Sequence, residues 1–219
     1  MADVIDCEYT IEGKGPPLFL IHGIGAARDA WRFIVPILRD HFTVITYDLR
    51  GHGNTDWSQS GDYTLNDFSS DVAYLIGELQ IKPVLVGASL GGLVGIYLEG
   101  KHERDSISGL VLVDIVPNMN IAGAERVKDF MLEHSKTGFT SLSEVSEILS
   151  KYNPHREKSS DLEGLKRNLR KRGEKWFWHW DPVYPVSHSH ESSRLVFGSF
   201  LQVPRPLHTF PSRPVQVLT

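Results

Sequence analysis

The feature that most constrains the fold is a G-x-S-x-G motif at Gly87–Gly91, which lies between two apolar segments. Val84–Val86 has the character of a short strand, and Leu93–Leu98 has that of a helix. A serine between a strand and a helix lies on a sharp, strained turn, where a side chain at either glycine would collide with the neighbouring elements. The order strand, turn, helix favours a nucleophile at Ser89 over a glycine-rich connection that carries an idle serine.

The same turn points the first amides of the following helix, including the N–H of Leu90, toward any oxyanion that forms there. A second apolar run, Leu18–Ile21, ends in the small loop His22–Gly25. The backbone N–H of Ile24 in this loop is the second donor that we expect, facing that of Leu90. Two amides converging on one developing negative charge require a small, glycine-rich loop.

Composition limits the class of protein. The 219 residues are 41% hydrophobic and 23% charged, which is typical of a globular protein with a substantial core. A formal net charge of −4 and the lack of a long basic run argue against nucleic acid as the main partner. Cys7 is the single cysteine, so an intrachain disulfide is excluded. Without a signal peptide or an apolar run of membrane-spanning length, the sequence predicts a cytoplasmic protein with no membrane contact.

Strand-like and helical segments alternate along the first half of the chain. The expected strands are residues 3–12, 18–21, 43–47, 84–88 and 108–114, and the expected helices include 28–40 and 64–79. Thr64 and Asp67 approximate a capping box at the start of the second of these helices. This alternation predicts a three-layer α/β domain with a mostly parallel sheet.

The sequence changes character after Pro117. We divide the chain into a core at 1–117, a helical lid at 118–182, and an irregular tail at 183–219 that is also the place for the remaining core strands. The pattern from Ala122 to Lys171 is helical throughout. It is followed by an aromatic cluster that either lines an apolar pocket or, as is commoner, attaches the lid to the core. The three candidate pocket residues are Trp176, Trp178 and Trp180.

A nicotinamide dinucleotide site is the remote alternative. Gly23–Ala27 follows a strand and precedes a helix, and Asp48 ends the next strand, where such sites hold a ribose hydroxyl. Two residues argue against this alternative. Arg28 occupies the third glycine position of the fingerprint, and His22 places a polar ring at the strand end. The fingerprint also leaves Ser89 unexplained.

Three motifs together resemble the α/β-hydrolase superfamily, in particular its small lidded serine esterases and cofactor-free haloperoxidases. The motifs are His22–Gly23, Asp48–Gly53 and Gly87–Gly92, and the resemblance covers residues 4–116 closely. It implies hydrolysis of a small carboxylic ester or related acyl compound through an acyl-enzyme on Ser89, with no cofactor and no metal. It also implies structural roles for four polar residues of these loops: His22, Asp48, Arg50 and His52.

The rest of a catalytic triad is not evident. In this superfamily the order is serine, acid, histidine, with the acid and the histidine beyond the lid. Val215–Thr219 resembles the start of a strand, and no acidic residue follows Glu191. Asp114 is the candidate acid, with a turn-capping role as its alternative. His188, His190 and His208 follow in the right order without a strand pattern.

We therefore expect a fold that is incomplete at its C-terminal end, and an impaired enzyme. The proline-rich tail after Val183 is consistent with truncation or with a shifted reading frame. A catalytically silent binding protein or a fragment is the alternative of a different class. The particular acyl substrate and the oligomeric state are left open by the sequence.

Overall fold

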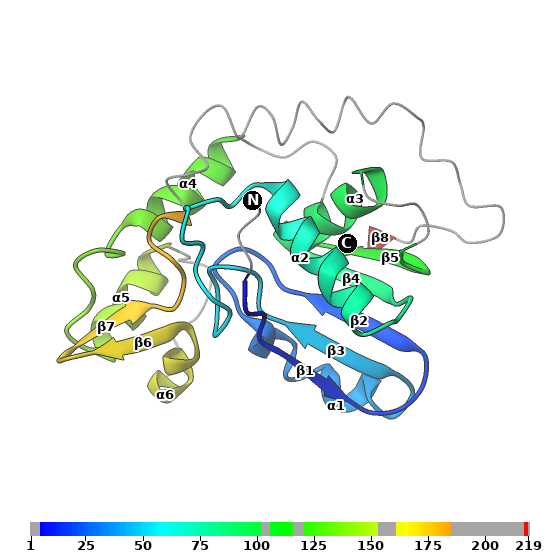
Figure 1. The fold of residues 1–219 in the computed structure, drawn as a ribbon. Coiled ribbons are helices and arrows are strands. Elements are labelled where there is room, and N and C mark those ends of the chain that lie inside the picture. Colours follow the sequence, from blue (N-terminus) through cyan, green and yellow to red (C-terminus); the bar gives the residue numbers. More distant parts are fainter. Residues whose placement is uncertain (1–4, 102–105, 116–120, 153–160, 185–216, 219) are drawn as a thin grey trace.

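The computed structural model describes residues 5–101, 106–115, 121–152 and 161–184, together with the backbone of Val217 and Leu218. A six-stranded sheet with the order β1-β3-β2-β4-β5-β8 forms the centre of the described fold (Figure 1). Its strands are β1 (Tyr9–Glu12), β2 (Pro17–Ile21), β3 (Thr43–Tyr47), β4 (Val84–Ala88), β5 (Gly109–Val113) and β8 (Val217–Leu218). Only β1 is antiparallel to its neighbour, so the predicted mostly parallel α/β sheet is confirmed.

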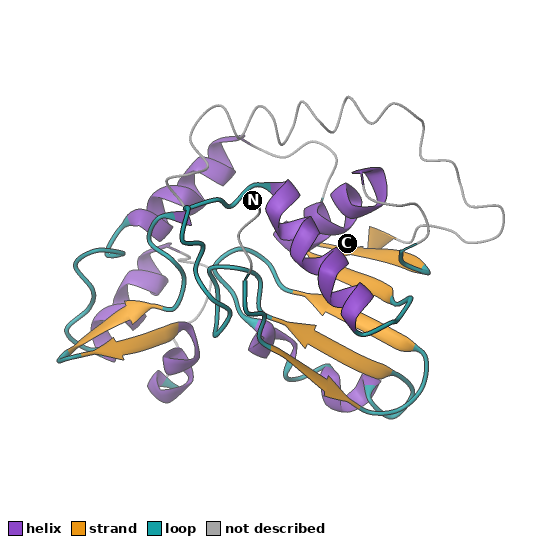
Figure 2. Cartoon of the chain, in the orientation of Figure 1, coloured by secondary structure: helices purple, strands orange, loops and turns teal. Residues whose placement is uncertain are grey.

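Helices lie on both faces of this sheet, and a separate group lies beside it (Figure 2). The helices of the core are η1 (Arg28–Trp31), α1 (Val35–Leu38), α2 (Leu65–Glu78) and α3 (Leu90–Lys101). The group at the left of the view is called the lid below. It consists of α4 (Ile121–Leu132), α5 (Leu142–Tyr152), α6 (Leu162–Leu165), η2 (Lys166–Asn168), and the hairpin of β6 (Leu169–Arg172) and β7 (Lys175–Trp178). The residues that follow β7, 179–182, are counted with the lid.

Strand β2 contributes to two hydrophobic cores because alternate residues of a strand face opposite sides of a sheet. Leu18 and Leu20 are buried on one face together with Val35 of α1. Phe19 and Ile21 belong to the larger core on the other face. The helical residues of that larger core include Phe68, Val72, Leu75 and Ile76 of α2, with Val94 and Leu98 of α3. Both faces are apolar, which explains why Leu18–Ile21 is a continuous hydrophobic run.

The capping box predicted for the second helix is present. The Thr64 side chain accepts a hydrogen bond from the Asp67 N–H, and the Asp67 carboxylate accepts one from the Thr64 N–H at 2.8 Å. These bonds satisfy backbone donors that have no acceptor within the first turn.

Two sequence predictions are wrong in detail. The helix predicted at 28–40 is two short pieces, η1 and α1, and Pro36 in the first turn of α1 fits the disturbance we expected from it. The lid is not helical throughout, because Leu169–Trp178 forms a hairpin with a two-residue turn. Gly173 in this turn has φ +59°, a conformation that glycine adopts without strain. Charged residues flank this turn, so the sequence lacks the alternation of apolar and polar residues that would have predicted a strand.

The chain after β7 attaches the lid to the core. The Asp181 N–H donates to the Gly51 carbonyl at 2.8 Å, and the Tyr63 hydroxyl donates to the Asp181 carboxylate. Tyr184 is 1% exposed, and its ring packs edge-on against the rings of Tyr63 and His52, with centroids 5.3 and 5.0 Å away. The lid and the sheet therefore share one buried joint near the carboxyl ends of the strands.

A buried ion pair stabilises the loop that supports this joint. Arg50 donates two hydrogen bonds of 2.6 Å to the two carboxylate oxygens of Asp71 on α2, and both side chains are more than nine-tenths buried. Arg50 also donates to the Asp62 carbonyl at 3.1 Å. The pair thus connects the loop after β3 with helix α2.

Removing the charge of Asp71 should strongly destabilise the fold. In Asp71→Asn the buried guanidinium of Arg50 loses its carboxylate, so we expect a loss of about 3 kcal/mol in urea unfolding. The matched control is Glu12→Gln, which removes a carboxylate from the half-exposed Arg39–Glu12 pair and should cost less than about 1 kcal/mol. Equal losses in the two variants would contradict the importance of the buried pair.

Candidate active site

Ser89 occupies a strained turn between β4 and α3. Its φ is +46°, a left-handed conformation that costs a residue with a side chain about 1–2 kcal/mol. The turn is closed on both sides, because the Ser89 N–H donates to the Val113 carbonyl at 3.0 Å and the Gly92 N–H donates to the Ser89 carbonyl at 2.9 Å. Ser89 itself is half-buried and lies at the carboxyl end of the central strand. Strain of this kind is typical of functional sites.

Both glycines of the motif are required by the packing. A Cβ on Gly87 would lie 2.4 Å from the carbonyl carbon of Gly91, and a Cβ on Gly91 would lie 2.4 Å from the Ile21 carbonyl oxygen. All of these are backbone atoms, which cannot move aside as a flexible side chain can. The collisions predicted for side chains at these two positions are therefore present in the fold.

The loop after β2 lies directly against Ser89. A Cβ on Gly23 would be 3.3 Å from the Cβ of Ser89, so the absence of a side chain permits this approach. The Ala26 N–H donates to the Gly23 carbonyl at 3.2 Å, and Gly25 has φ +67°, which together describe a tight turn. Residues 23–25 are called the oxyanion loop below, after the role predicted for Ile24.

The two backbone N–H groups predicted to stabilise an oxyanion, those of Ile24 and Leu90, are available as donors. Within the described ranges the Ile24 N–H has no acceptor, and the Ile24 side chain is 37% exposed. Leu90 is the first residue of α3, and the first four N–H groups of a helix have no acceptor inside it. The predicted oxyanion hole at Ile24 and Leu90 is compatible with this arrangement and stays a prediction.

His22 braces the oxyanion loop, as expected for it. Its Nε2 accepts a hydrogen bond of 3.0 Å from the Leu49 N–H, so the proton is on Nδ1, which donates to the Gly23 carbonyl at 2.8 Å. The ring is 1% exposed. It therefore connects the loops that follow β2 and β3.

Two further histidines continue this arrangement. His52 Nε2 accepts a hydrogen bond of 3.2 Å from the Gly25 N–H, and its Nδ1 donates to the Arg50 carbonyl at 3.0 Å. His179, at the end of the lid, accepts a hydrogen bond of 2.7 Å at Nδ1 from the Gly53 N–H. The ring centroids of His52 and His179 are 6.2 Å apart. The sequence analysis did not single out His179, because nothing in an aromatic run indicates which ring reaches the core.

Burial keeps the imidazoles of His22 and His179 neutral. It lowers the pKa of His22 to about 4, against a smaller opposing effect of the hydrogen bond to Gly23. It also lowers the pKa of His179 to about 2, and the neighbouring His52, His22 and Arg170 lower it further. A neutral ring can accept a backbone N–H at one nitrogen, whereas a protonated ring cannot.

The carboxylate of Asp48 is occupied by the loops around it. It accepts hydrogen bonds from the Arg28 N–H at 2.6 Å, the Arg28 guanidinium at 2.7 Å and the Asn54 N–H at 3.1 Å. The side chain of Arg28, at the third position of the dinucleotide fingerprint, thus fixes Asp48 in place. This arrangement fits the structural role expected for Asp48 and gives no support to a ribose-binding role.

Asp114, the candidate acid, lies next to Ser89 in the sheet. Ala88 pairs with Val113, so Asp114 follows at the same carboxyl edge, with φ +52° and an exposed side chain. Within the described ranges no hydrogen bond or ion pair joins its carboxylate to another side chain. Its catalytic role stays a prediction. His188, His190 and His208 lie outside the described residues.

The tryptophans of the lid pack in a buried cluster. Trp178 and Trp180 are each 4% exposed and stack with centroids 4.7 Å apart. The Trp180 ring also faces Gly25, 3.5 Å from where a Cβ would lie. Trp176 is half-buried and pairs with Phe139. Of these contacts, the one between Trp180 and Gly25 joins the lid to the core, and the others lie within the lid segment. Pocket-lining roles for the three residues stay a prediction.

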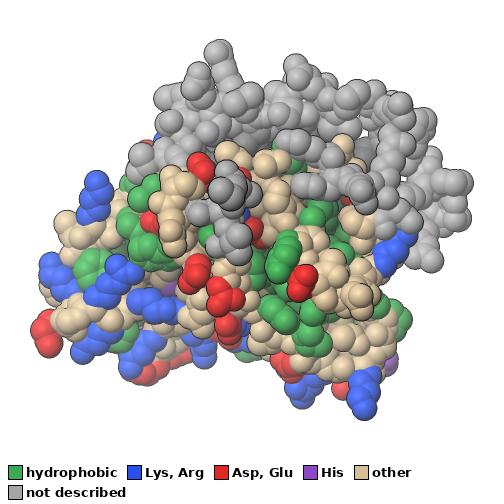
Figure 3. Space-filling model, viewed as in Figure 1, with side chains coloured by type: hydrophobic (Ala, Val, Ile, Leu, Met, Phe, Trp, Pro, Cys, Tyr) green, Lys and Arg blue, Asp and Glu red, His purple; other side chains and the backbone are tan. Residues whose placement is uncertain are grey.

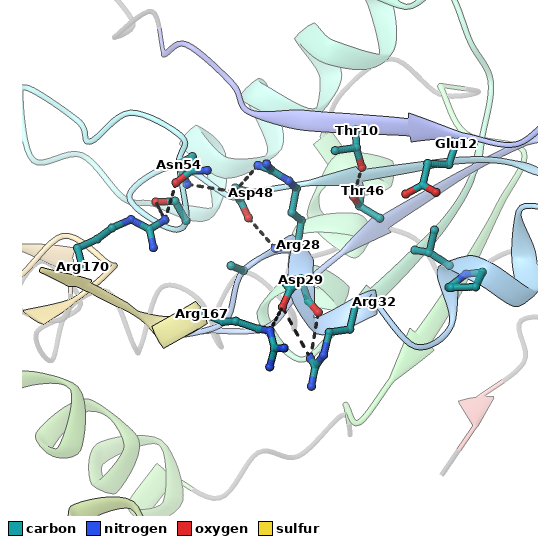
Figure 4. Close-up of a pocket in the computed structure, with 14 residues that line it drawn as sticks. Thr10, Glu12, Arg28, Asp29, Arg32, Thr46, Asp48, Asn54, Arg167 and Arg170 are labelled. Atoms are coloured by element: carbon teal, nitrogen blue, oxygen red, sulfur yellow. Dashed lines mark hydrogen bonds and ion pairs between the residues drawn. The ribbon is translucent and has the colours of Figure 1, made fainter. Parts of the chain in front are cut away.

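A hollow of about 430 Å³ lies apart from Ser89, between β1, η1 and the lid hairpin (Figure 4). Several of the charged residues that line the hollow form ion pairs or hydrogen bonds with one another or with the backbone. Arg167 of the lid is 3.2 Å from the Asp29 carboxylate of η1, and Arg170 donates to the Gly53 carbonyl at 3.1 Å. Lys and Arg side chains are also numerous on the lid surface at the left of the space-filling view (Figure 3). The hollow thus forms a polar seam between lid and core.

No group of three or more His, Cys, Asp or Glu residues in the described ranges is arranged to hold a metal ion. In the same ranges, every helix is too short or too polar to cross a membrane.

Comparison with known proteins identifies relatives. The family described as alpha/beta hydrolase fold matches residues 16–138, more than half of the chain. Esterase Rv0045c of Mycobacterium tuberculosis is 29% identical over 78% of this chain and 58% of its own length. A soluble epoxide hydrolase of Corynebacterium is 34% identical over 52% of this chain and 40% of its own length. The chain therefore spans about half the length of these two relatives.

A solved structure extends the likeness to the fold as a whole. The crystal structure of E-2-(acetamidomethylene)succinate hydrolase superimposes with a TM-score of 0.77 at 20% identity, over 96% of this chain and 75% of that chain. At this identity the similarity concerns the fold alone.

The buried neutral histidines should make the fold sensitive to acid. The unfolded chain binds a proton on each ring near pH 6.5, whereas the folded pKa values are about 4 for His22 and about 2 for His179. Stability from these groups is complete above pH 6.5 and is lost as the pH falls toward 4, at about 1.4 kcal/mol per pH unit for each histidine. Urea unfolding across this window measures the slope, and His22→Gln should reduce it. A slope that is unchanged in this variant would contradict the assignment.

Proposed function

The chain belongs to the alpha/beta hydrolase family, and on this premise we propose that it is a serine hydrolase acting on a small carboxylic ester or related acyl compound. The observation that carries the proposal is the strained Ser89 turn with the oxyanion loop against it. Relatives named esterase, epoxide hydrolase and protein phosphatase methylesterase support hydrolysis as the reaction class. The choice of a carboxylic ester rests on the serine and the amides beside it.

In this mechanism Ser89 Oγ attacks the acyl carbon, and its proton passes to a general base as the C–O bond forms. The negative charge that develops on the carbonyl oxygen is stabilised by the N–H groups of Ile24 and Leu90. Collapse of the tetrahedral intermediate expels the alcohol and leaves an acyl-enzyme. Water then attacks the acyl carbon and releases the carboxylic acid, which frees Ser89 for another cycle.

The general base is the open part of this mechanism. Within the described ranges, no side chain forms a hydrogen bond with the Ser89 hydroxyl, and Asp114 is the acid that we propose from its place beside the turn. A serine without a base is a poor nucleophile, although an oxyanion hole alone retains part of the rate enhancement. This observation favours one second candidate, a protein that binds an acyl compound without turning it over.

A fluorophosphonate probe distinguishes the two candidates. If Ser89 is an activated nucleophile, the probe should label the folded chain, and Ser89→Ala should abolish labelling because the attacking oxygen is gone. The matched control is Ser108→Ala, a serine in the loop that precedes β5 and lies at the opposite end of that strand. Labelling that persists in Ser89→Ala would place the reactive nucleophile elsewhere and overturn the proposal for Ser89. A folded sample that is never labelled would favour the silent binder.

A panel of nitrophenyl esters tests the substrate class. We expect hydrolysis of short acyl esters, with kcat falling by several orders of magnitude in Ser89→Ala. Release of nitrophenol is followed by absorbance, with the variant as the control for background hydrolysis. Equal rates for the two proteins would contradict an acyl-enzyme on Ser89.

A further inference from the structure

We infer that His52 and His179 are positioning residues, which hold the oxyanion loop against Ser89 and couple its placement to the lid. The inference rests on the proposed function, since it concerns the amide of Ile24 as an oxyanion donor. It assigns a role in that reaction to a histidine of the lid that does not touch the substrate. The two histidines act through backbone N–H groups, one in each of the loops that follow β2 and β3.

The first step concerns the peptide group between Ile24 and Gly25. Its N–H, which belongs to Gly25, donates to Nε2 of His52 at 3.2 Å. The Gly23 carbonyl accepts from His22 and from the Ala26 N–H, so the polar groups on either side of Ile24 are also engaged. Of the N–H groups of residues 24–26, the Ile24 N–H alone has no acceptor in the described ranges. These bonds thus fix the loop around the donor that it contributes to the proposed oxyanion hole.

The second step concerns what holds His52. Its Nδ1 donates to the Arg50 carbonyl at 3.0 Å, and its ring is 0% exposed. The loop that carries it is anchored at Gly53, whose N–H donates to Nδ1 of His179 at 2.7 Å. His179 therefore acts on the oxyanion loop through the loop of His52. Removing the acceptor at His179 would leave a partly buried N–H without a partner.

The third step connects the lid. His179 and Trp180 follow directly after β7, and Trp180 packs over Gly25 together with Met131 of α4. The Gly25 backbone also lies close enough to His179 to affect its pKa. The same short segment thus contacts the oxyanion loop from one side and the His52 loop from the other. A movement of the lid at this point changes the surroundings of the Ile24 amide.

Matched substitutions separate the two hydrogen bonds from general damage to the fold. Glutamine places a side-chain oxygen near the position of Nε2, and asparagine places one near Nδ1. At His52 the acceptor of interest is Nε2, so His52→Gln preserves it and His52→Asn does not. At His179 the acceptor is Nδ1, so His179→Asn preserves it and His179→Gln does not. The two sites therefore predict opposite orders for the same pair of residues.

The measurement is the rate of fluorophosphonate labelling at Ser89, separated into a binding constant and a maximal rate. We expect the maximal rate to fall by about 10- to 100-fold in His52→Asn and His179→Gln, because misplaced donors act on the reaction step. Their partners His52→Gln and His179→Asn should keep more of the rate, and probe binding should change little in all four. His41→Gln, at an exposed position, serves as the control with an unchanged rate.

A second readout does not depend on reactivity. Hydrogen exchange at the Gly25 amide should be at least about fivefold faster in His52→Asn than in His52→Gln, because its acceptor is lost. If the unmodified chain is not labelled but the exchange difference is present, the proposed function is overturned, whereas the role of His52 in holding the oxyanion loop stands. The positioning role would be overturned by equal maximal rates within each pair of variants, together with equal exchange at the Gly25 amide in the two His52 variants. Unfolding curves measured in parallel show whether both members of a pair are equally folded.

Discussion

The close approach of two backbone turns is the constraint on which the rest of this structure depends. The carboxyl ends of β2 and β4 are adjacent in the sheet, and Gly23 and Ser89 lie just beyond them. A Cβ placed on Gly23 would be only 3.3 Å from the Cβ of Ser89. A side chain on Gly23 would force its neighbours to shift, and Ser89 has its strained φ at the same place. The parallel sheet supplies the geometry, since its strands end at one edge.

A turn so poor in side chains must be held by its surroundings. Imidazole rings supply this support, because each neutral ring offers one donor and one acceptor that can join two loops. His22 connects the loops after β2 and β3, and His52 does the same through its bonds to the Gly25 N–H and the Arg50 carbonyl. Burial keeps the His22 ring neutral at the cost of sensitivity to acid. The same polar groups would be costly if they were unpaired.

The lid is part of this support rather than a cover added to a finished core. His179, Trp180 and Asp181 are consecutive. His179 and Asp181 bond to Gly53 and Gly51 in the His52 loop, and Trp180 packs on Gly25 of the oxyanion loop. The buried Tyr184 completes the joint. A change in the lid can therefore reach Ser89 without any contact between lid and substrate, through hydrogen bonds whose partners lie more than a hundred residues apart.

The sequence by itself determined the alternation of strands and helices, the turn at Ser89 and the capping box at Thr64, because each depends on neighbours within a few residues. The resemblance to the α/β-hydrolase superfamily also implied structural roles for His22 and Asp48. Only the tertiary structure decided the contribution of His179, since its acceptor serves Gly53, 126 positions away. The lid hairpin was likewise decided by pairing between the charged segment Leu169–Arg172, where the predicted helical pattern ended, and the aromatic segment Lys175–Trp178. Local chemistry specifies turns and periodicity, whereas which buried donor meets which acceptor depends on contacts that form only when the chain has folded.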